Sequence, residues 1–292
     1  MEYGDKHILV LGAGASGIGA SWVLAQVGAH VVLNDYKPVT LPADEEKRLV
    51  SAGVDIITGR QDESLLDGVD RIVISPGISL DIPIVKAAQA RGIDVVSEVE
   101  VAYELSKSPI VAVTGTNGKT TTTTLLTKVL EGTGKPVRVG GNIGDSLSEV
   151  AYSMPADGFL VAELSSYQLE TIKHFRPIGA IMLNITPDHL ARHKTMENYI
   201  AAKERIFENQ LSTDFMVLNI DDPIVADMKH CVPSHILEIS QHQVVSNGAY
   251  YDKGQCYVTK NGMATPVIGS ADIHIPGSHN IENILTVIAL TY

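Results

Sequence analysis

Residues 112–124 read AVTGTNGKTTTTT, and the fold expected for the second half of the chain follows from them. An apolar run leads into a glycine-rich turn, and threonines follow the Gly-Lys pair. This order predicts a buried strand, a phosphate-binding loop and a helix. In such a loop the backbone amides would cradle phosphate oxygens, Lys119 would neutralise the β and γ phosphates, and Thr120 or Thr121 would offer a hydroxyl to Mg²⁺. Because the complete pattern has a glycine where Val113 stands, a chance Gly-Lys-Thr in a loop is the alternative.

A metal that accompanies a nucleoside triphosphate needs a carboxylate, ideally at the end of a neighbouring buried strand. The segment FLVAE at 159–163 supplies one, since four apolar residues lead directly to Glu163. Glu163 is therefore the predicted Mg²⁺ ligand. The alternative is that its carboxylate caps the turn that follows the strand.

Lys203 lies on the apolar face of the helix predicted over residues 196–209, where Tyr199, Ile200 and Ile206 share its side. A lysine that reaches past its apolar neighbours to water is the common explanation for this arrangement. The alternative is a lysine that is held inside a site for its chemistry. The sequence pattern leaves both interpretations open.

A second glycine-rich turn, GAGASGIG at 12–19, follows the apolar run 8–11 and precedes a helix predicted to reach Gly28. Glycines let the backbone approach a diphosphate at a helix N-terminus, where amides and the helix dipole favour negative charge. Asp35 ends the next predicted strand, where dinucleotide sites hold a ribose hydroxyl. The turn therefore predicts a diphosphate-containing nucleotide, NAD being one of several, and a tight turn without ligand is the alternative.

Alternating apolar runs and helix-compatible segments predict an α/β fold with parallel sheets. The strands expected in the first half are 8–11, 30–33, 54–57, 71–75 and 94–96. Those expected in the second half are 110–113, 159–162, 180–185 and 215–218, followed by antiparallel hairpins over 248–268. Lys107-Ser108-Pro109 breaks a helix, so we expect domains over 1–107 and 108–292. The last helical segment has no C-terminal cap, which predicts that the protein continues beyond it.

The composition is that of a globular protein, with 45% hydrophobic and 19% charged residues. The 34 acidic and 22 basic residues give a formal net charge of −12, without a basic stripe for nucleic acid or anionic membrane. Cys231 and Cys256 lack metal-ligand spacing, which favours a reducing compartment. No stretch reaches the ~18 apolar residues of a membrane span. We expect a cytoplasmic monomer without nucleic-acid or membrane partners.

Six motifs occur in the order and spacing of the Mur ligases, which the sequence resembles over all 292 residues. They are GTNGKTT at 115–121, GGNIG at 140–144, ELSSYQLE at 163–170, NITPDH at 184–189, AAK at 201–203 and GSHNIEN at 277–283. GTNGKT alone would not separate the branches of this family, but ELSSYQLE with GGNIG and GAGASGIG resembles the D-glutamate-adding branch. The resemblance implies a Rossmann-like domain for the UDP-sugar substrate, a central P-loop ATPase domain, and a C-terminal amino-acid-binding domain outside this sequence.

The same resemblance implies the site residues. ATP would be bound by Gly115, Thr116, Asn117, Gly118, Lys119, Thr120, Thr121, Asn280 and Asn283. The UDP-substrate site would be lined by Gly14, Ala15, Ser16, Asp35, Tyr36, Gly77 and Asn142. Mg²⁺ would be held by Thr120, Glu163, His189 and Lys203, the last as a carbamate, and the catalytic residues would be Lys119, His189 and Lys203. Ala191 and Tyr36-Lys37 depart from the residues usual in the family.

The activity implied is ATP-dependent amide formation, in which D-glutamate is added to UDP-N-acetylmuramoyl-L-alanine during peptidoglycan precursor synthesis. The substrate carboxylate would attack the γ-phosphate while Mg²⁺ and Lys119 stabilise the transferring group, and D-glutamate would capture the acyl phosphate. Without the C-terminal domain we expect binding with little or no turnover. An NAD(P)-dependent oxidoreductase would leave GTNGKTT and Glu163 unexplained. A non-catalytic nucleotide-binding regulator would bind Mg-ATP without responding to the UDP-muramoyl compound.

Overall fold

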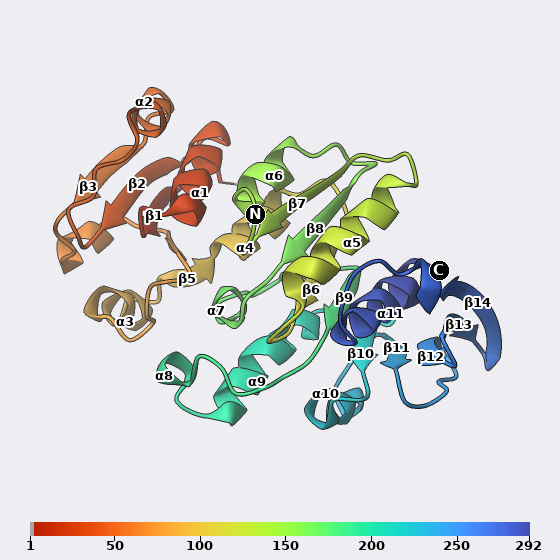
Figure 1. The fold of residues 1–292 in the computed structure, drawn as a ribbon. Coiled ribbons are helices and arrows are strands. Elements are labelled where there is room, and N and C mark those ends of the chain that lie inside the picture. The colour runs from red at the N-terminus through yellow and green to blue at the C-terminus, as the bar shows by residue number, and fades with distance from the viewer. Residues whose placement is uncertain (1–2) are drawn as a thin grey trace. The chain divides into compact units, whose positions relative to one another are not determined.

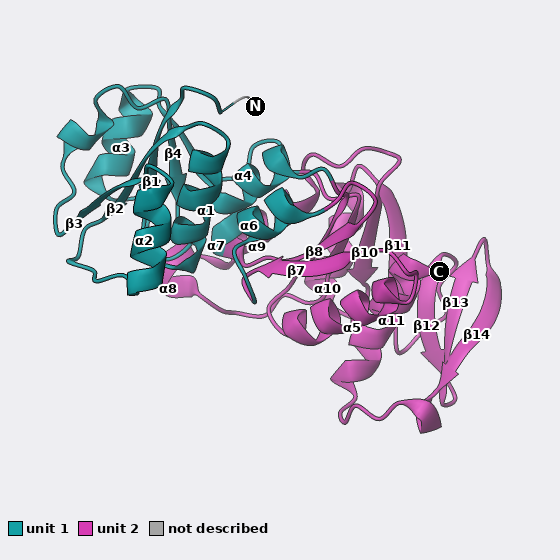
Figure 2. Ribbon diagram, turned by 90° about the horizontal axis from the view of Figure 1, so that it is seen from above, with its two compact units in different colours: residues 1–107, 144–154, 167–175 teal, residues 108–143, 155–166, 176–292 magenta. Residues whose placement is uncertain are grey.

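The structure is a computed structural model that describes residues 3–292. It divides into two compact units (Figure 2). Unit 1 comprises Met1–Lys107, Gly144–Met154 and Tyr167–Phe175. Unit 2 comprises Ser108–Ile143, Pro155–Ser166 and Arg176–Tyr292. The chain therefore leaves unit 1 after Lys107 and returns to it twice before it ends in unit 2.

Unit 1 contains a parallel sheet with the strand order β3-β2-β1-β4-β5 (Figure 1). Its strands are β1 His7–Leu11, β2 His30–Asp35, β3 Asp55–Thr58, β4 Arg71–Ile74 and β5 Asp94–Ser97. Its helices are α1 Ala15–Gln26, α2 Ala43–Ser51, η1 Glu63–Leu66, α3 Pro83–Ala90, α4 Glu98–Leu105 and α6 Leu147–Ser153. Strands β2 and β3 are added on one side of β1, and β4 and β5 on its other side. This order confirms the predicted Rossmann-like parallel sheet.

Both faces of this sheet are covered by apolar side chains. Along β1, Ile8 and Val10 belong to one buried cluster, whereas Leu9 and Leu11 belong to the other. Side chains alternate between the faces of a strand, so a continuous apolar run fits a strand that is buried on both sides. The run ILVL therefore specified the central strand of unit 1.

The first glycine-rich turn joins β1 to α1 by a close backbone approach. Gly12 has a φ of +101°, which favours glycine, and a Cβ atom added at Gly17 would lie 1.8 Å from the Gly12 carbonyl oxygen. A Cβ atom added at Gly14 would meet no other atom within 4 Å. The turn thus needs glycine at positions 12 and 17 for packing, whereas position 14 is open.

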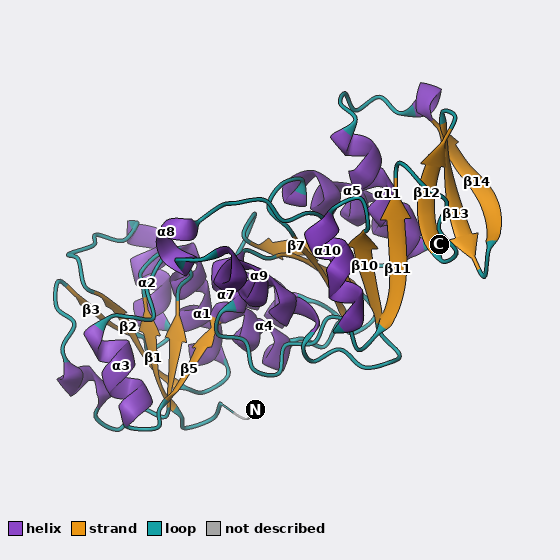
Figure 3. Cartoon of the chain, turned by 90° about the horizontal axis from the view of Figure 1, so that it is seen from below, coloured by secondary structure: helices purple, strands orange, loops and turns teal. Residues whose placement is uncertain are grey.

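Unit 2 contains a nine-stranded sheet with the order β14-β13-β12-β11-β10-β9-β6-β8-β7. Its strands are β6 Ile110–Thr114, β7 Val137–Gly141, β8 Phe159–Glu163, β9 Gly179–Met182, β10 Phe215–Asn219, β11 His235–Ser240, β12 Gly248–Asp252, β13 Gln255–Lys260 and β14 Met263–Gly269. The pairs from β7 to β12 are parallel, and β12, β13 and β14 form antiparallel hairpins (Figure 3). The predicted α/β class with added hairpins is confirmed.

The helices of unit 2 include two long ones that pack together on the sheet. Leu126 of the first and Leu285 of the second share a buried cluster with Val113 and Val161 of the central strands. The helices are α5 Lys119–Glu131, α7 Ser166–Leu169, α8 Leu190–His193, α9 Met196–Glu204, η2 Arg205–Phe207, α10 Pro223–Asp227, η3 Met228–His230, η4 Ser270–Asp272 and α11 His279–Thr291, of which α7 extends into unit 1. In the described part of the chain, no helix is both long and apolar enough to cross a membrane.

Four details of unit 2 differ from the sequence-based expectations. The strand expected over 180–185 ends at Met182, because the residues that follow turn toward the glycine-rich loop. The helix expected over 196–209 ends at Glu204 and continues only as the short η2 turn. Strands β7 and β11 were not expected, and both are partly exposed, so neither has the continuous apolar run of a central strand.

The Gly17→Ala substitution should destabilise unit 1 by ~3 kcal/mol, because the new methyl group meets a backbone oxygen that no side-chain movement can remove. Gly14→Ala is the matched control, and we expect it to cost ~1 kcal/mol or less, since its methyl group enters open space at a helix N-cap. Urea unfolding followed by circular dichroism measures both. Equal losses in the two variants would contradict the close approach described here.

Candidate functional site

The second glycine-rich loop, residues 115–118, connects the buried strand β6 to the start of α5. Gly115 has a φ of +147° and Gly118 a φ of +87°, so both adopt backbone conformations that favour glycine. A Cβ atom at Gly118 would also lie 2.6 Å from Asn283 Oδ1. No side chain caps α5 at Gly118. The loop therefore presents a helix N-terminus that suits an anion.

Asn184 braces this loop from the end of β9. Its Oδ1 accepts a hydrogen bond of 2.8 Å from the amide of Asn117, and its Nδ2 donates one of 3.1 Å to the Asn117 carbonyl. The amide of Thr116 donates to the Asn184 carbonyl at 2.8 Å. Asn184 begins the NITPDH motif but had no predicted role. Its position directly after a buried strand, at the edge where the loop lies, was the available signal.

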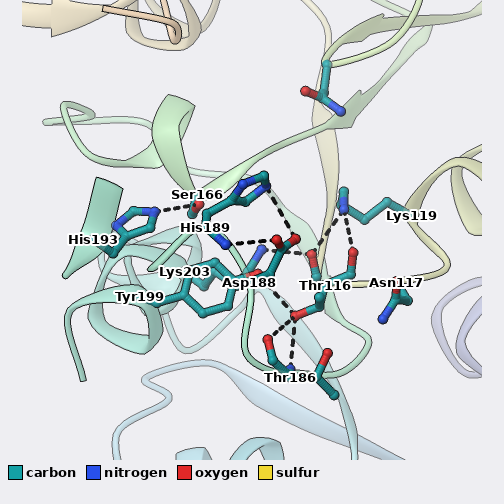
Figure 4. Close-up of polar contacts among 12 residues, drawn as sticks. Thr116, Asn117, Lys119, Ser166, Thr186, Asp188, His189, His193, Tyr199 and Lys203 are labelled. Carbon is teal, nitrogen blue, oxygen red and sulfur yellow. Dashed lines mark hydrogen bonds and ion pairs between the residues drawn. The ribbon is translucent and has the colours of Figure 1, made fainter. Parts of the chain in front are cut away.

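Lys119 bends back over the loop that precedes it (Figure 4). Its Nζ donates hydrogen bonds to the carbonyl oxygens of Gly115 at 3.2 Å and Thr116 at 2.8 Å. A lysine ammonium has three donors, so this arrangement holds the charge beside the loop amides and leaves one donor for another acceptor. The ammonium is thus placed where it can pair with a phosphate that the amides cradle.

Glu163 ends β8 and is almost fully buried, with 1% of its surface exposed. Its Oε2 accepts a hydrogen bond of 2.9 Å from Thr120 Oγ1, in the first turn of α5. Its Oε1 accepts one of 2.8 Å from Asn142 Nδ2, in the GGNIG segment. The structure therefore brings together three predicted site residues from three separate motifs.

Lys203 is buried, with 2% of its surface exposed, so the interpretation of a side chain reaching to water is wrong. Its Nζ donates to the Gly115 carbonyl at 2.7 Å and lies 5.0 Å from the centroid of the Tyr199 ring. The pKa of Lys203 is lowered to about 7, because burial and then the charge of Lys119 lower it against a smaller opposing effect of Asp188. A substantial fraction of this amine is therefore uncharged at neutral pH.

His189 is the N-cap of α8 and has a φ of +55°, an uncommon conformation for a residue with a side chain. Its Nε2 lies 3.3 Å from Asp188 Oδ2, and both side chains are more than two-fifths exposed. Figure 4 shows this pair in the same view as Lys119 and Lys203. The imidazole therefore stays accessible while its neighbour orients it.

A polar network that the motifs did not predict supports the same loop. Ser166 Oγ lies 2.9 Å from His193 Nε2, and both residues are buried. The His193 ring packs at 5.3 Å from the Tyr199 ring, and the Tyr199 hydroxyl lies 3.0 Å from Thr116 Oγ1 (Figure 4). These contacts link α7, α8 and α9 to the glycine-rich loop.

Asn280 and Asn283 lie at the start of α11, next to the first turns of α5. Asn283 Oδ1 accepts a hydrogen bond of 3.1 Å from Thr122 Oγ1, and its Nδ2 donates to Asn280 Oδ1 at 2.9 Å. Asn280 Nδ2 donates to the Pro276 carbonyl at 2.7 Å. Both side chains are buried. In this arrangement they hold α11 against α5 and keep Asn283 beside Gly118.

The residues predicted for the UDP-substrate fall into both units. In unit 1, Gly14 is the N-cap of α1, which begins with Ala15 and Ser16. Asp35 Oδ2 accepts a hydrogen bond of 3.0 Å from the Ala13 amide, so this carboxylate holds the glycine turn to the end of β2. The remaining residues are Gly77, which follows β4, Tyr36, which is 68% exposed, and Asn142, which belongs to unit 2.

The residues of unit 2 fit a Mg²⁺ ion that is bound together with nucleotide phosphates. Mg²⁺ prefers oxygen ligands and usually takes one or two carboxylates plus phosphate oxygens. Glu163 and the hydroxyl of Thr120 provide oxygen ligands beside the anion-binding loop. Within residues 3–292, no group of three or more His, Cys, Asp or Glu side chains could hold a metal alone. The site thus suits a metal that arrives with its substrate.

Comparisons with known proteins agree with this arrangement. A family model described as the Mur ligase middle domain matches residues 113–291, and one described as the MurD-like N-terminal domain of Mur ligases matches residues 6–97. A UDP-N-acetylmuramoylalanine–D-glutamate ligase of Thermoanaerobacter sp. strain X514 is 44% identical over all 292 residues, which cover 64% of that relative. The ligase of the same name from Halalkalibacterium halodurans is 42% identical over 97% of this chain and 62% of its own length.

Solved structures support the fold alone, because their sequence identities are low. The UDP-N-acetylmuramate:L-alanyl-gamma-D-glutamyl-meso-diaminopimelate ligase of Neisseria meningitidis matches with a TM-score of 0.65 at 21% identity, covering 98% of this chain and 93% of that one. MurF of Acinetobacter baumannii matches with a TM-score of 0.53 at 14% identity, covering 98% and 56%. The chain spans less than two thirds of the length of the curated relatives described above.

Replacing Lys203 by methionine should change how stability depends on pH. The folded-state pKa of about 7 lies below the usual 10.5, so the folded wild type binds fewer protons than the unfolded chain between these values. The wild-type free energy of unfolding should therefore rise with pH across this window relative to Lys203→Met, and the lysine should be most destabilising below pH 7. Urea unfolding at several values from pH 6.5 to 9.5 measures the difference, and parallel curves would contradict a buried amine with a lowered pKa.

Proposed function

Because this chain belongs to the Mur ligase family, we propose that it is part of an ATP-dependent ligase that adds D-glutamate to UDP-N-acetylmuramoyl-L-alanine. The observation that carries this proposal is the grouping of Lys119, Glu163 and Lys203 around one glycine-rich loop. The identity of about two residues in five to D-glutamate ligases over the whole chain supports the choice of substrate. As the chain spans 64% of the first relative, activity and substrates belong to the proposal for the whole protein.

ATP is proposed to bind at the loop between β6 and α5. The amides of residues 115–121 would hold phosphate oxygens, and Lys119 would turn its ammonium toward the terminal phosphates. Bound Mg²⁺ would neutralise phosphate charge, with Glu163 and Thr120 as its protein ligands and His189 as a further candidate. Asn280 and Asn283, which lie beside Gly118, are proposed to face the adenine nucleotide.

Lys203 is proposed to act as a carbamate. Its uncharged amine would attack CO₂, forming an N–C bond and losing a proton, and the product would be a carboxylate on a side chain that was cationic. The lowered pKa favours this reaction because only the uncharged amine is a nucleophile. A carboxylate there would add an oxygen ligand for Mg²⁺ and would remove the repulsion between the buried Lys203 and the half-buried Lys119.

Unit 1 is proposed to hold the UDP-sugar substrate. The N-terminus of α1, with Gly14, Ala15 and Ser16, offers amides to a diphosphate at the carboxyl edge of a parallel sheet, where such ligands bind. Asp35 ends β2, Tyr36 follows it, and Gly77 follows β4, so these residues lie at the same edge. Residues 1–107 and 108–292 would thus serve as substrate-binding and ATP-binding domains, and a further amino-acid-binding domain would complete the ligase.

In the proposed reaction the L-alanine carboxylate attacks the γ-phosphate, and an acyl phosphate and ADP result. In this step Lys119 would stabilise the negative charge of the transferring phosphoryl group, and the loop amides would hold the phosphates in place. The amine of D-glutamate would then attack the acyl carbon, and collapse of the adduct would release phosphate. A cytoplasmic location is part of this proposal.

Thermal unfolding of this chain with separate ligands tests the proposal. UDP-N-acetylmuramoyl-L-alanine and Mg-ATP should each raise the midpoint, by an amount that corresponds to ~2.7 kcal/mol at a hundredfold excess over the dissociation constant. NAD should leave the midpoint unchanged. Lys119→Ala should abolish the response to Mg-ATP but keep the response to the UDP compound, because Lys119 lies in unit 2. A response to NAD alone would instead support an oxidoreductase, and a response to Mg-ATP alone a nucleotide-binding regulator.

A further inference from the structure

Asn34 is a buried polar residue of unit 1 that the site described above does not use. It is the last residue but one of β2, and 0% of its surface is exposed. Burying an amide side chain costs free energy unless hydrogen bonds compensate it. The partners of Asn34 therefore show which part of unit 1 it serves.

The Asn34 side chain bonds the end of β3 and the loop that follows it. Its Nδ2 donates to the carbonyl oxygens of Ile57 and Arg60, both at 2.8 Å, and its Oδ1 accepts from Gln61 Nε2 at 3.0 Å. Both hydrogens of the amide group and its carbonyl oxygen are thus used. One side chain therefore fixes residues 57–61 at the carboxyl end of β2.

The same loop is bonded to the turn that carries Tyr36. The Gly59 amide donates to the carbonyl oxygens of Asp35 at 3.0 Å and of Lys37 at 3.2 Å. The Lys37 amide in turn donates to Asp35 Oδ1 at 3.0 Å. The backbone on both sides of Tyr36 is therefore fixed, although the Tyr36 side chain itself is exposed.

This turn lies at the edge of the sheet where a nucleoside is expected. In doubly wound sheets the diphosphate binds at the first glycine-rich turn, and the nucleoside lies toward the carboxyl end of the second strand. Asp35 Oδ2 joins these two places, since it accepts from the Ala13 amide at 3.0 Å. An exposed aromatic ring on a fixed turn suits stacking on a flat base, because little motion of the backbone is lost on binding.

We propose that Asn34 is a positioning residue for the nucleoside end of the UDP-substrate. It acts by holding residues 57–61 against the turn 35–37, and it touches no substrate itself. The inference rests on the proposed function of unit 1. The diphosphate end has a separate backbone bond, in which the Gly12 amide donates to the Asn34 carbonyl at 2.8 Å, and this bond does not involve the Asn34 side chain.

The experiment compares Asn34→Ala, which removes all three side-chain hydrogen bonds, with Glu104→Gln. The side chain of Glu104 is also buried in unit 1, with 6% exposed, but it bonds Arg71 at 2.8 Å. Arg71 begins β4, at the opposite edge of the parallel sheet, so Glu104→Gln is a control for lost stability alone. Calorimetry measures the affinity of each folded variant for UDP-N-acetylmuramoyl-L-alanine. Displacement of this compound gives the affinity of inorganic pyrophosphate for the same site.

A purely structural role predicts lower stability in both variants and no change in either affinity. The positioning role predicts that Asn34→Ala weakens binding of the UDP compound about tenfold, which is the order of one lost contact between a base and an aromatic ring. Its affinity for pyrophosphate should stay that of the wild type. Glu104→Gln should keep both affinities.

Wild-type affinity for the UDP compound in folded Asn34→Ala, or an equal loss of affinity for pyrophosphate, would overturn the inference. If Asn34→Ala does not fold, hydrogen exchange of the wild type decides. The UDP compound, but not pyrophosphate, should then slow exchange of the amides of residues 57–61, because the loop and the turn stabilise one another. Unchanged exchange in this loop would contradict the positioning role.

A failure of the proposed function gives a different result. In that case the wild type itself would not bind UDP-N-acetylmuramoyl-L-alanine, and the positioning role would fall with the proposed site. Binding by the wild type together with an unaltered Asn34→Ala variant would reject the inference alone.

Discussion

A buried carboxylate needs hydrogen-bond donors, and the candidate site of unit 2 is organised around this requirement at Glu163. The donors come from Thr120, at the start of α5, and from Asn142, after β7. Each donor belongs to a segment that follows a different strand of the parallel sheet. Since these strands end at the same edge, satisfying one carboxylate fixes the loop, the helix start and the GGNIG segment relative to one another.

Two lysine side chains of this site lie close to one another on the same loop. Lys119 and Lys203 both donate to the carbonyl of Gly115, so two cationic side chains converge on one loop. One result is the lowered pKa of Lys203, which burial lowers most and the nearby charge of Lys119 lowers further. A phosphate on the loop, or a carbamate on Lys203, would relieve this repulsion. The geometry therefore favours anionic ligands before any is bound.

The glycines and asparagines around the loop make this convergence possible. Gly118 has no side chain that would fill the space where Asn283 lies. The side chain of Asn184 bonds both the amide and the carbonyl of Asn117. The asparagines come from positions far from the loop in sequence. In unit 1, Gly17 allows α1 to approach the Gly12 carbonyl in a comparable way. The glycine-rich turns before α1 and α5 thus share a close approach of other atoms to a glycine.

The sequence was enough to predict the α/β class, the central strands and the glycine-rich turns, because apolar periodicity and backbone geometry are local properties. It also indicated Glu163, which ends an apolar run, and Lys203, which lies within an apolar helix face. It did not predict β7 or β11, whose exposed residues hide the pattern, nor the hydrogen bonds of Asn184 and His193. Those depend on which segments meet, and only the tertiary structure decides that, since hydrogen bonds between distant residues leave no trace in local spacing.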